Sequence, residues 1–452
     1  MSASSLNKTK DSSRMTVLRR QKKLWLMAAA AAVLAGCADD KPLNTFEPRG
    51  PRAELIDDLM LPIWYLMGVF FVVVVIGGIV LSIKNRVNGD ELDPNDLPAQ
   101  THGNTKLELG WTILPAVILA GVFIPVMNAI LELEERNDGC EVGDIGPDCD
   151  GLDVLVVGQQ WWWEYRYDVD GDGFFVDANG DGMVDDHDRE LPLELILDPD
   201  DVVTANELVV PVDAQVDLLL TSRDVIHSYW IPRLNGKRDT VPGRWTTWSL
   251  EASEEGKFVG WCTEFCGLSH ARMRMSTIAL SAADFDTWLS NQMQPAEVPT
   301  DPEALAGREI FQNQCMSCHL IDDGEFEYPE NFAETVPLVS HAAPNLTHFA
   351  TRTTFAGGIF ASYAGPGTDA NDDAFDVSNY VDISERAVDP TSADDFRWNS
   401  AELKRWVANA PDRKAMASDV NPETGLGRGM LPFPQLSDEE LDQVVAYLAT
   451  LD

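Results

Sequence analysis

Two long stretches of the chain carry no charged side chain, and they limit its fold more than any other feature. Leu59–Ile83 and Leu109–Leu131 each exceed the roughly 20 apolar residues that a helix needs to cross a bilayer. Core helices of water-soluble proteins are seldom so long and so uniformly apolar. The sequence therefore predicts a membrane protein with a hairpin of two transmembrane helices.

The N-terminal segment, residues 1–36, has the order of an export signal. A basic region from Lys8 to Lys23 precedes the apolar run Leu24–Val33. The run ends in Leu34-Ala35-Gly36-Cys37, which resembles a bacterial lipobox and predicts lipidation of Cys37. The alternative is an ordinary cleavage site beside an unmodified cysteine.

The export signal also predicts the orientation, which the positive-inside rule leaves open because basic residues flank both sides of the hairpin. Cleavage places residue 37 outside the cell, and two spans within residues 37–131 return the chain outside. Residues from about 132 onward are therefore expected on the outer face of a bacterial plasma membrane.

The composition argues against one class of partner. The chain has 74 acidic and 33 basic residues, a formal net charge of -41. Its field repels nucleic acids and anionic lipid surfaces. A chain this acidic either is adapted to high salt or faces a basic partner, and the composition leaves both open.

The exported part divides into two predicted domains. Residues 132–294 contain short β-branched and aromatic runs typical of an all-β sandwich, namely Val154–Val157, Trp161–Tyr167, Leu208–Val212, Val216–Leu220 and Thr246–Leu250. A linker follows at residues 295–302. The helical period then returns in Glu303–Gln314, Ala401–Ala408 and Asp438–Thr450. Residues 303–452 are therefore expected to form a mostly α-helical domain, with an acidic insertion at residues 357–399.

Two features of the β domain suggest an extracellular protein. Cys140 and Cys149 flank a short Gly/Asp/Pro-rich loop, and the simplest interpretation is a disulfide. An Asp-rich insertion at residues 168–188 has oxygen-bearing side chains at the spacing of a calcium loop, with Gly182 at the sixth position: Asp177, Asn179, Asp181, Asp185 and Asp188. The alternative is a solvated acidic turn, and calorimetry with calcium on the soluble domain distinguishes the two.

The segment Trp261–Met273 predicts a copper site. Cys262, Cys266, His270 and Met273 place two thiols, an imidazole and a thioether within twelve residues, and His227 lies upstream. Soft sulfur ligands with imidazole select copper over hard cations. Two cysteines four residues apart can bridge two metal ions, so that each copper receives one histidine. A structural zinc site would leave Met273 unexplained, and a disulfide would leave both histidines unexplained.

These residues give the chain a clear resemblance to subunit II of haem–copper cytochrome c oxidases, whose dinuclear copper centre is called CuA. The matching segments are Gly158–Tyr167, Asp224–Pro232, Gly236–Gly243 and Trp261–Met273. With the two spans, the resemblance covers most of residues 50–292. It implies a cupredoxin-like sandwich, and it implies subunits I and III as partners.

The resemblance implies roles for individual residues. His227, Cys262, Cys266, His270 and Met273 match the copper ligands, and the Glu264 carbonyl matches the remaining one. The Glu264 carboxylate would bind magnesium at the boundary with subunit I. Trp161 matches the residue through which electrons arrive from cytochrome c. Glu108 matches a glutamate at the mouth of a proton channel, although a helix-end carboxylate can also simply reach water. Gln159 and Trp162 differ from the His and Tyr common in relatives, which leaves the electron-accepting surface less certain.

The C-terminal domain carries a second redox motif. Cys315-Met-Ser-Cys318-His319 is a C-x-x-C-H sequence, typical of covalent haem c attachment with the histidine as iron ligand. Gly429–Phe433 resembles the methionine loop of class I cytochromes c, so Met430 is the expected sixth ligand and Met416 the alternative. Ala343–Leu346 resembles the segment whose proline carbonyl accepts a hydrogen bond from the ligand histidine.

The combination resembles the caa3-type oxidases, in which a fused cytochrome c domain delivers electrons to CuA. It implies an electron-transfer subunit that serves dioxygen reduction and proton pumping in subunit I. One alternative is a subunit of a CuA-containing nitric oxide reductase. Another is a stand-alone copper–haem electron-transfer lipoprotein, and a calcium-dependent adhesin would leave the copper and haem ligands unexplained.

Overall fold

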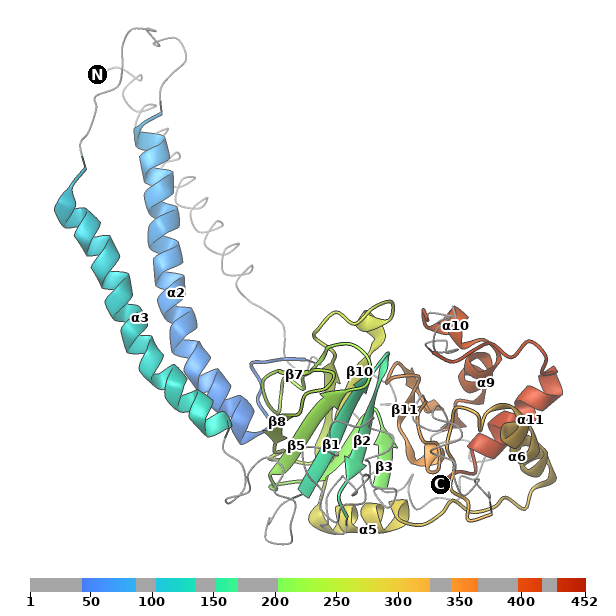
Figure 1. The fold of residues 1–452 in the computed structure, drawn as a ribbon. Helices are drawn as coiled ribbons and strands as arrows, with labels where there is room; N and C mark the ends of the chain where they lie inside the picture. Colours follow the sequence, from blue (N-terminus) through green and yellow to red (C-terminus); the bar gives the residue numbers. More distant parts are fainter. Residues whose placement is uncertain are drawn as a thin grey trace, which may run out of the picture.

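The computed structural model describes residues 43–86, 103–134, 152–169, 202–325, 343–364, 397–416 and 429–452. The predictions for the signal segment and Cys37, for the Cys140–Cys149 disulfide and for the calcium ligands at positions 177–188 lie outside these ranges. Within them, a helical hairpin projects from a β domain, and a C-terminal unit of helices and short strand pairs lies on the other side of that domain (Figure 1).

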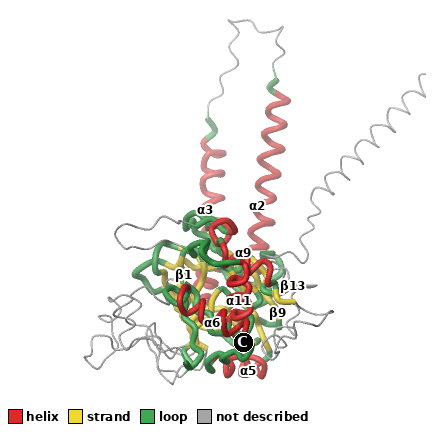
Figure 2. Tube along the Cα trace, turned by 90° about the vertical axis from the view of Figure 1, so that its right-hand side faces the viewer, coloured by secondary structure: helices red, strands yellow, loops and turns green. Residues whose placement is uncertain are grey.

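The hairpin consists of α2 (Pro51–Lys84) and α3 (Thr105–Leu133). Both helices are long and apolar enough to cross a membrane, and most of their side chains are exposed in the isolated chain. They extend together away from the β domain in two perpendicular views (Figures 1 and 2). The uncharged runs correctly predicted the two helices but not their full length, because α2 continues into polar residues at the β-domain end and α3 does so at both of its ends.

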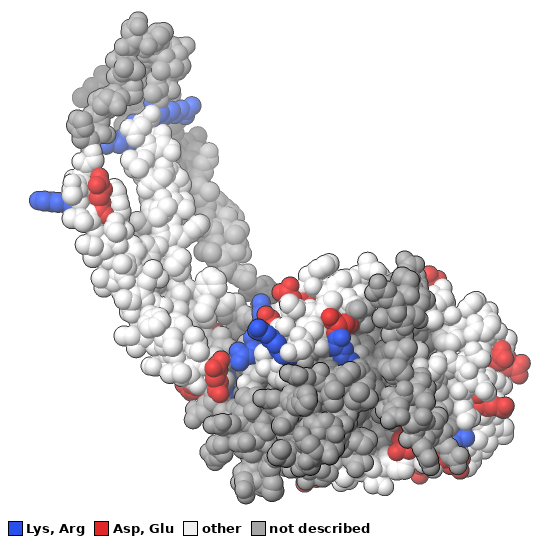
Figure 3. Space-filling view, in the orientation of Figure 1, with Lys and Arg blue, Asp and Glu red and all other residues white. Residues whose placement is uncertain are grey.

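Polar contacts join the two helices at the base of the hairpin and connect this base to the β domain. Arg52, in the first turn of α2, donates hydrogen bonds to the backbone oxygens of Glu132 (3.2 Å) and Leu133 (3.0 Å) at the end of α3. Ion pairs connect the same region to the β domain, namely Arg49–Glu254, Arg233–Glu47 and Arg238–Glu134. Figure 3 shows basic and acidic side chains together at this junction.

The β domain contains two main sheets. The larger has the strand order β3 (Val202–Ala205), β2 (Trp162–Tyr167), β1 (Leu152–Gln159), β5 (Val216–Ser222), β8 (Thr246–Leu250). The smaller has the order β4 (Glu207–Pro211), β10 (Arg274–Leu280), β9 (Gly256–Trp261), and β6 (His227–Tyr229) pairs with β7 (Arg238–Thr240). This arrangement confirms the predicted cupredoxin-like sandwich.

Side chains alternate between the two faces of each strand, and this alternation determines which residues enter the hydrophobic core. In β2, Trp163, Tyr165 and Tyr167 are fully buried in the hydrophobic core, while Glu164 on the other face pairs with Arg166 at 2.8 Å. Strands β3, β6, β7, β9 and β10 were not predicted. Neither was helix α5 (Ala282–Gln292), which buries Phe285 and Trp288 against this core.

The C-terminal unit is built around α6 (Pro302–Gln314) and α11 (Asp438–Leu448). Gly307 permits their close crossing, because a Cβ there would lie 1.9 Å from the backbone oxygen of Gln443. Phe311 and Tyr447 pack edge to face in the core at a centroid distance of 5.7 Å. The other elements are short: η4 (Phe349–Thr351), α9 (Ser400–Ala408), α10 (Ala410–Arg413) and the strand pairs β11–β12 (Thr354–Phe355, Phe360–Ala361) and β13–β14 (Tyr363–Ala364, Arg397–Trp398).

We expect Arg52→Met to lower the thermal unfolding midpoint of the protein in detergent. The change removes charged hydrogen bonds to the end of α3, each worth roughly 1.5–3 kcal/mol in general. Arg49→Met is the matched control, since it removes a more exposed ion pair worth about 0–1 kcal/mol. Equal midpoints for the two variants would contradict a special role for Arg52.

Candidate metal centre

The copper ligands predicted from sequence come from two separate parts of the β domain. Cys262, Cys266 and His270 follow β9 in one loop, which ends at Met273 before β10. His227 lies on β6, where it is fully buried and pairs with Thr240 of β7. Gly158 of β1 makes room for its imidazole, because a Cβ there would lie 2.9 Å from Cδ2 of His227. Strand packing thus brings His227 to the loop.

The structure brings these ligands together in one cluster. The Sγ atoms of Cys262 and Cys266 are 3.8 Å apart. The Nδ1 atom of His227 lies 3.9 Å from Cys262 Sγ, and that of His270 lies 3.6 Å from Cys266 Sγ. The thioether of Met273 is 3.8 Å from Cys266 Sγ, and the Glu264 carbonyl is 3.2 Å from Cys262 Sγ.

This geometry excludes a disulfide and fits two bridged metal ions. The sulfur separation is far longer than the roughly 2.05 Å of a disulfide bond. The two sulfurs lie centrally, with one imidazole beside each and the weaker ligands, Met273 and the Glu264 carbonyl, next to opposite sulfurs. Such a soft, symmetric donor set suits a pair of copper ions.

The ionisation of the two thiols is strongly linked. A hydrogen bond from Cys266, together with His227 and backbone donors, lowers the pKa of Cys262 to about 4 despite its burial. The same pairing, with burial, raises the pKa of Cys266. Both thiols must lose their protons to act as thiolate ligands, so metal binding at this cluster releases protons.

Neighbouring side chains fix the ligands from outside the cluster. Asp224 Oδ1 lies 2.8 Å from His227 Nε2, which leaves Nδ1 to face the sulfurs. Burial opposes a charge on His227, but its hydrogen bonds with Asp224 and Cys262 outweigh this effect and raise the pKa of the imidazole. The side chains of Gln160 and Trp161 both donate to the backbone oxygen of Cys266, at 2.5 and 2.9 Å.

The sequence identified the ligands but not these outer contacts. Asp224 was recognised only as part of a matching segment. Its position three residues before His227 could have indicated that it orients this histidine. Glu264 has an exposed side chain on the copper loop. Glu108 lies in the first turn of α3, at the end of the hairpin far from the copper loop (Figure 1).

The predicted haem-binding residues gather in the C-terminal unit. Cys315 ends α6 and is buried, whereas Cys318 is exposed. The Nδ1 atom of His319 is 2.8 Å from the carbonyl oxygen of Pro344, the contact expected from sequence. Met430 packs against the core of this unit, whereas Met416 packs against the core of the β domain.

We expect Asp224→Asn to weaken copper binding by roughly 10- to 100-fold, the usual effect of losing a carboxylate that orients a ligand histidine. Competition with a copper chelator, followed by EPR, measures this affinity. Asp239→Asn is the control, because Asp239 is exposed on β7 and pairs with β6 through its backbone. Unchanged affinity in Asp224→Asn would contradict the role assigned to this carboxylate.

Comparison with known proteins agrees with this centre. Residues 152–280 match the family model "Cytochrome C oxidase subunit II, periplasmic domain". Cytochrome c oxidase subunit 2 of Alkalihalophilus pseudofirmus is 27% identical over 438 residues, which cover 95% of this chain and 98% of that relative. Its counterpart in Bacillus subtilis is 30% identical over 357 residues, which cover 75% of this chain and 85% of the relative.

Among solved structures, the periplasmic domain of subunit II of cytochrome oxidase from Bradyrhizobium japonicum is 28% identical. The match covers 31% of this chain and 92% of that structure, with a TM-score of 0.23. The Bacillus subtilis relative carries the conclusion, and the family match, the Cys/His cluster and the two apolar helices agree with it. The chain belongs to the cytochrome c oxidase subunit II family and is the CuA-bearing electron-transfer subunit of a membrane-bound terminal oxidase, in which subunit I is its partner.

Proposed function

We propose that this subunit accepts electrons at a haem c in its C-terminal unit and passes them through CuA to subunit I, where dioxygen is reduced to water and protons are pumped. The observation that carries the proposal is that one chain contains the Cys/His cluster and a half-buried C-x-x-C-H histidine, with the two units in contact. The alignment with the Alkalihalophilus pseudofirmus relative supports it, since it extends over 95% of this chain.

The surroundings of His319 suit an iron ligand. Burial lowers the pKa of His319 to about 4, although the hydrogen bond to Pro344 opposes this shift. The imidazole is therefore neutral at physiological pH, and with Nδ1 donating to Pro344 its Nε2 lone pair is available to a metal. Cys315 and Cys318 lie in the same turn and would hold the porphyrin through thioether bonds.

Met430 is the better candidate for the opposite side of the iron. It packs against the same core as Cys315 and Phe311, whereas Met416 packs against the copper domain. A thioether ligand raises the potential of a haem, as an electron-accepting centre requires. When bound, the haem and the copper pair each supply a reversible one-electron couple.

The copper loop also offers a surface to subunit I. Phe265 and Leu268 are 75% and 66% exposed, and the Glu264 carboxylate lies beside them. We assign this carboxylate to a magnesium ion at the boundary with subunit I. The two metal-binding units lie on the extracytoplasmic side in this proposal. Cytochrome c or another small carrier supplies the electrons, and subunit III completes the complex.

The first test uses the purified complex and two methionine variants. We expect Met430→Ala to lose the methionine–iron charge-transfer band of the oxidised haem, and Met416→Ala to keep it. The copper EPR signal should be unchanged in both variants. Loss of the band in Met416→Ala alone would reverse the assignment, and a wild-type complex without covalently bound haem would contradict the proposed haem c route.

The second test concerns Glu108, for which we propose a position at the mouth of a proton channel into subunit I. Its place in the first turn of α3, at the end of the hairpin away from the β domain, supports this role, since the proposed orientation makes that end the cytoplasmic one. We expect Glu108→Gln to slow turnover and proton uptake by the complex. Glu54→Gln, near the opposite end of the hairpin, is the control, and equal rates in the two variants would contradict the proposal.

A further inference from the structure

The C-terminal unit contacts the copper domain through a loop directly beside the copper ligands. The segment after α10 lies on the copper loop, where Arg272 Nη1 donates to the backbone oxygen of Arg413 at 2.6 Å. The hydroxyl of Ser269 donates to the backbone oxygen of Ala415. Both copper-domain residues lie between Cys266 and Met273, so this contact adjoins the metal cluster itself.

Lys414 is the central residue of this contact. Only 3% of its surface is exposed, and its Nζ donates to the backbone oxygens of Trp161 (2.7 Å) and Ala356 (2.8 Å). Burying an amine is costly unless it has partners, and burial lowers the pKa of Lys414 to about 7. A transient contact between the two units would not bury the Lys414 amine in this way.

Gly357 allows three segments to meet at this point. A Cβ at Gly357 would lie 2.3 Å from Lys414 Nζ and 2.6 Å from the backbone oxygen of Trp161. Its φ of +78° is also one that glycine adopts without strain. The backbone oxygen of Gly357 accepts a hydrogen bond from Arg274 N at 3.1 Å, so the contact continues onto β10.

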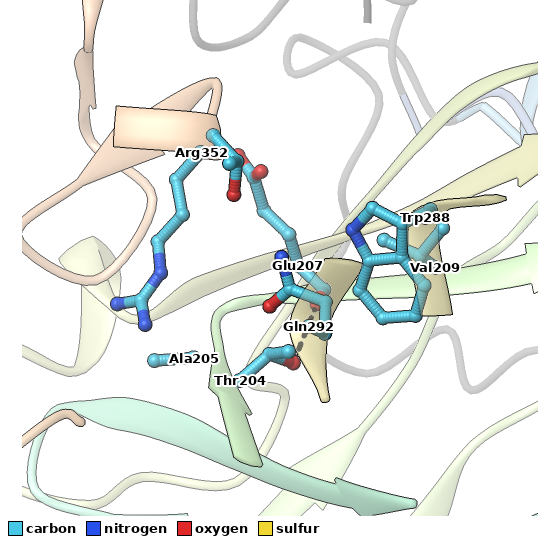
Figure 4. A pocket seen from close by; sticks show the side chains of 8 residues that line it. Thr204, Ala205, Glu207, Val209, Trp288, Gln292 and Arg352 are labelled. Atoms are coloured by element: carbon cyan, nitrogen blue, oxygen red, sulfur yellow. Dashed lines mark hydrogen bonds between the residues drawn. The ribbon is translucent and has the colours of Figure 1, made fainter. Parts of the chain in front are cut away.

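A second buried contact fixes the other end of the interface. The carboxylate of Glu207, only 2% exposed, accepts hydrogen bonds from the Thr353 backbone N–H (2.9 Å) and from the hydroxyls of Thr353 and Thr354. Buried Lys257 donates to the Thr353 hydroxyl at 3.0 Å. A small cavity beside Glu207 lies between Trp288 of the copper domain and Arg352 of the C-terminal unit (Figure 4). Two separated polar contacts define one orientation of the units.

Trp161 lies at the same contact and is itself buried. Its side chain is only 4% exposed, and its Nε1 donates to the backbone oxygen of the copper ligand Cys266. The Trp161 backbone meets Lys414 and Gly357 from the C-terminal unit. A separate donor protein therefore could not contact this residue while the two units are joined in this way.

We propose that two buried contacts lock the C-terminal unit onto the copper domain, one made by Lys414 and the other by Glu207 with Thr353 and Thr354. The Trp161 surface at this interface is then an internal electron-transfer contact rather than the docking site of an external donor. This inference rests on the proposed haem c route. One electron at a time passes from ferrous haem to the oxidised copper pair, and no bond is made or broken. Lys414 acts as a positioning residue that holds the two units together at Trp161.

The test uses Lys414→Met in the purified complex. We expect hydrogen–deuterium exchange in residues 353–358 and 412–416 to rise by roughly tenfold or more, since two hydrogen bonds of a buried amine at the interface are lost. Electron transfer from haem to CuA after flash reduction should slow by about the same factor or more. The optical and EPR spectra of both centres should stay unchanged.

Two further variants make the result decisive. Lys404→Met is the matched control, because Lys404 pairs with Asp438 and Asp442 inside the C-terminal unit, and it should change neither measurement. Gly357→Ala should reproduce the effects of Lys414→Met without removing a charge. Unchanged exchange and unchanged electron transfer in both Lys414→Met and Gly357→Ala would overturn the locked interface. If the wild-type complex lacks covalently bound haem, that result contradicts the haem c route instead. Hydrogen–deuterium exchange would still test whether the interface is locked.

Discussion

The placement of two sulfur atoms 3.8 Å apart at one end of a β-sandwich is the constraint on which the functional part of this structure depends. The Cys-x-x-x-Cys loop supplies both sulfurs, but a metal pair also needs an imidazole on each side. His270 comes from the same loop, whereas His227 arrives on β6, and Gly158 leaves room for its ring. The sandwich therefore serves as a rigid frame that fixes the ligands before any metal binds.

The copper loop is surrounded by groups that connect it to the rest of the protein. Asp224 orients His227, and Gln160 and Trp161 bind the backbone of Cys266. Beyond them, Lys414 ties Trp161 to the C-terminal unit. At the base of the hairpin, Arg52 ties α2 to the end of α3, and three ion pairs connect this base to the sandwich.

Prediction from sequence succeeded where chemistry is encoded locally. The ligand set of residues 262–273 was predicted because cysteine, histidine and methionine at that spacing have few alternative explanations, and long uncharged runs predicted both membrane helices. It failed for β9, β10 and α5, whose residues lack a clear period. It also treated residues 357–399 as one acidic insertion, whereas Gly357 and Gly358 pack against the copper domain.

The sequence by itself determined which cysteine, histidine and methionine residues offer donor atoms, the two apolar helices and the likeness to oxidase subunit II, since each depends on residue type and short-range spacing. Only the tertiary structure decided that Asp224 orients His227, that Met430 and Met416 lie in different cores, and that Lys414 binds the backbone of Trp161. The physical reason is distance along the chain, because Lys414 and Trp161 are separated by 253 positions. Contacts of this kind depend on how whole units pack, which no local pattern of residues specifies.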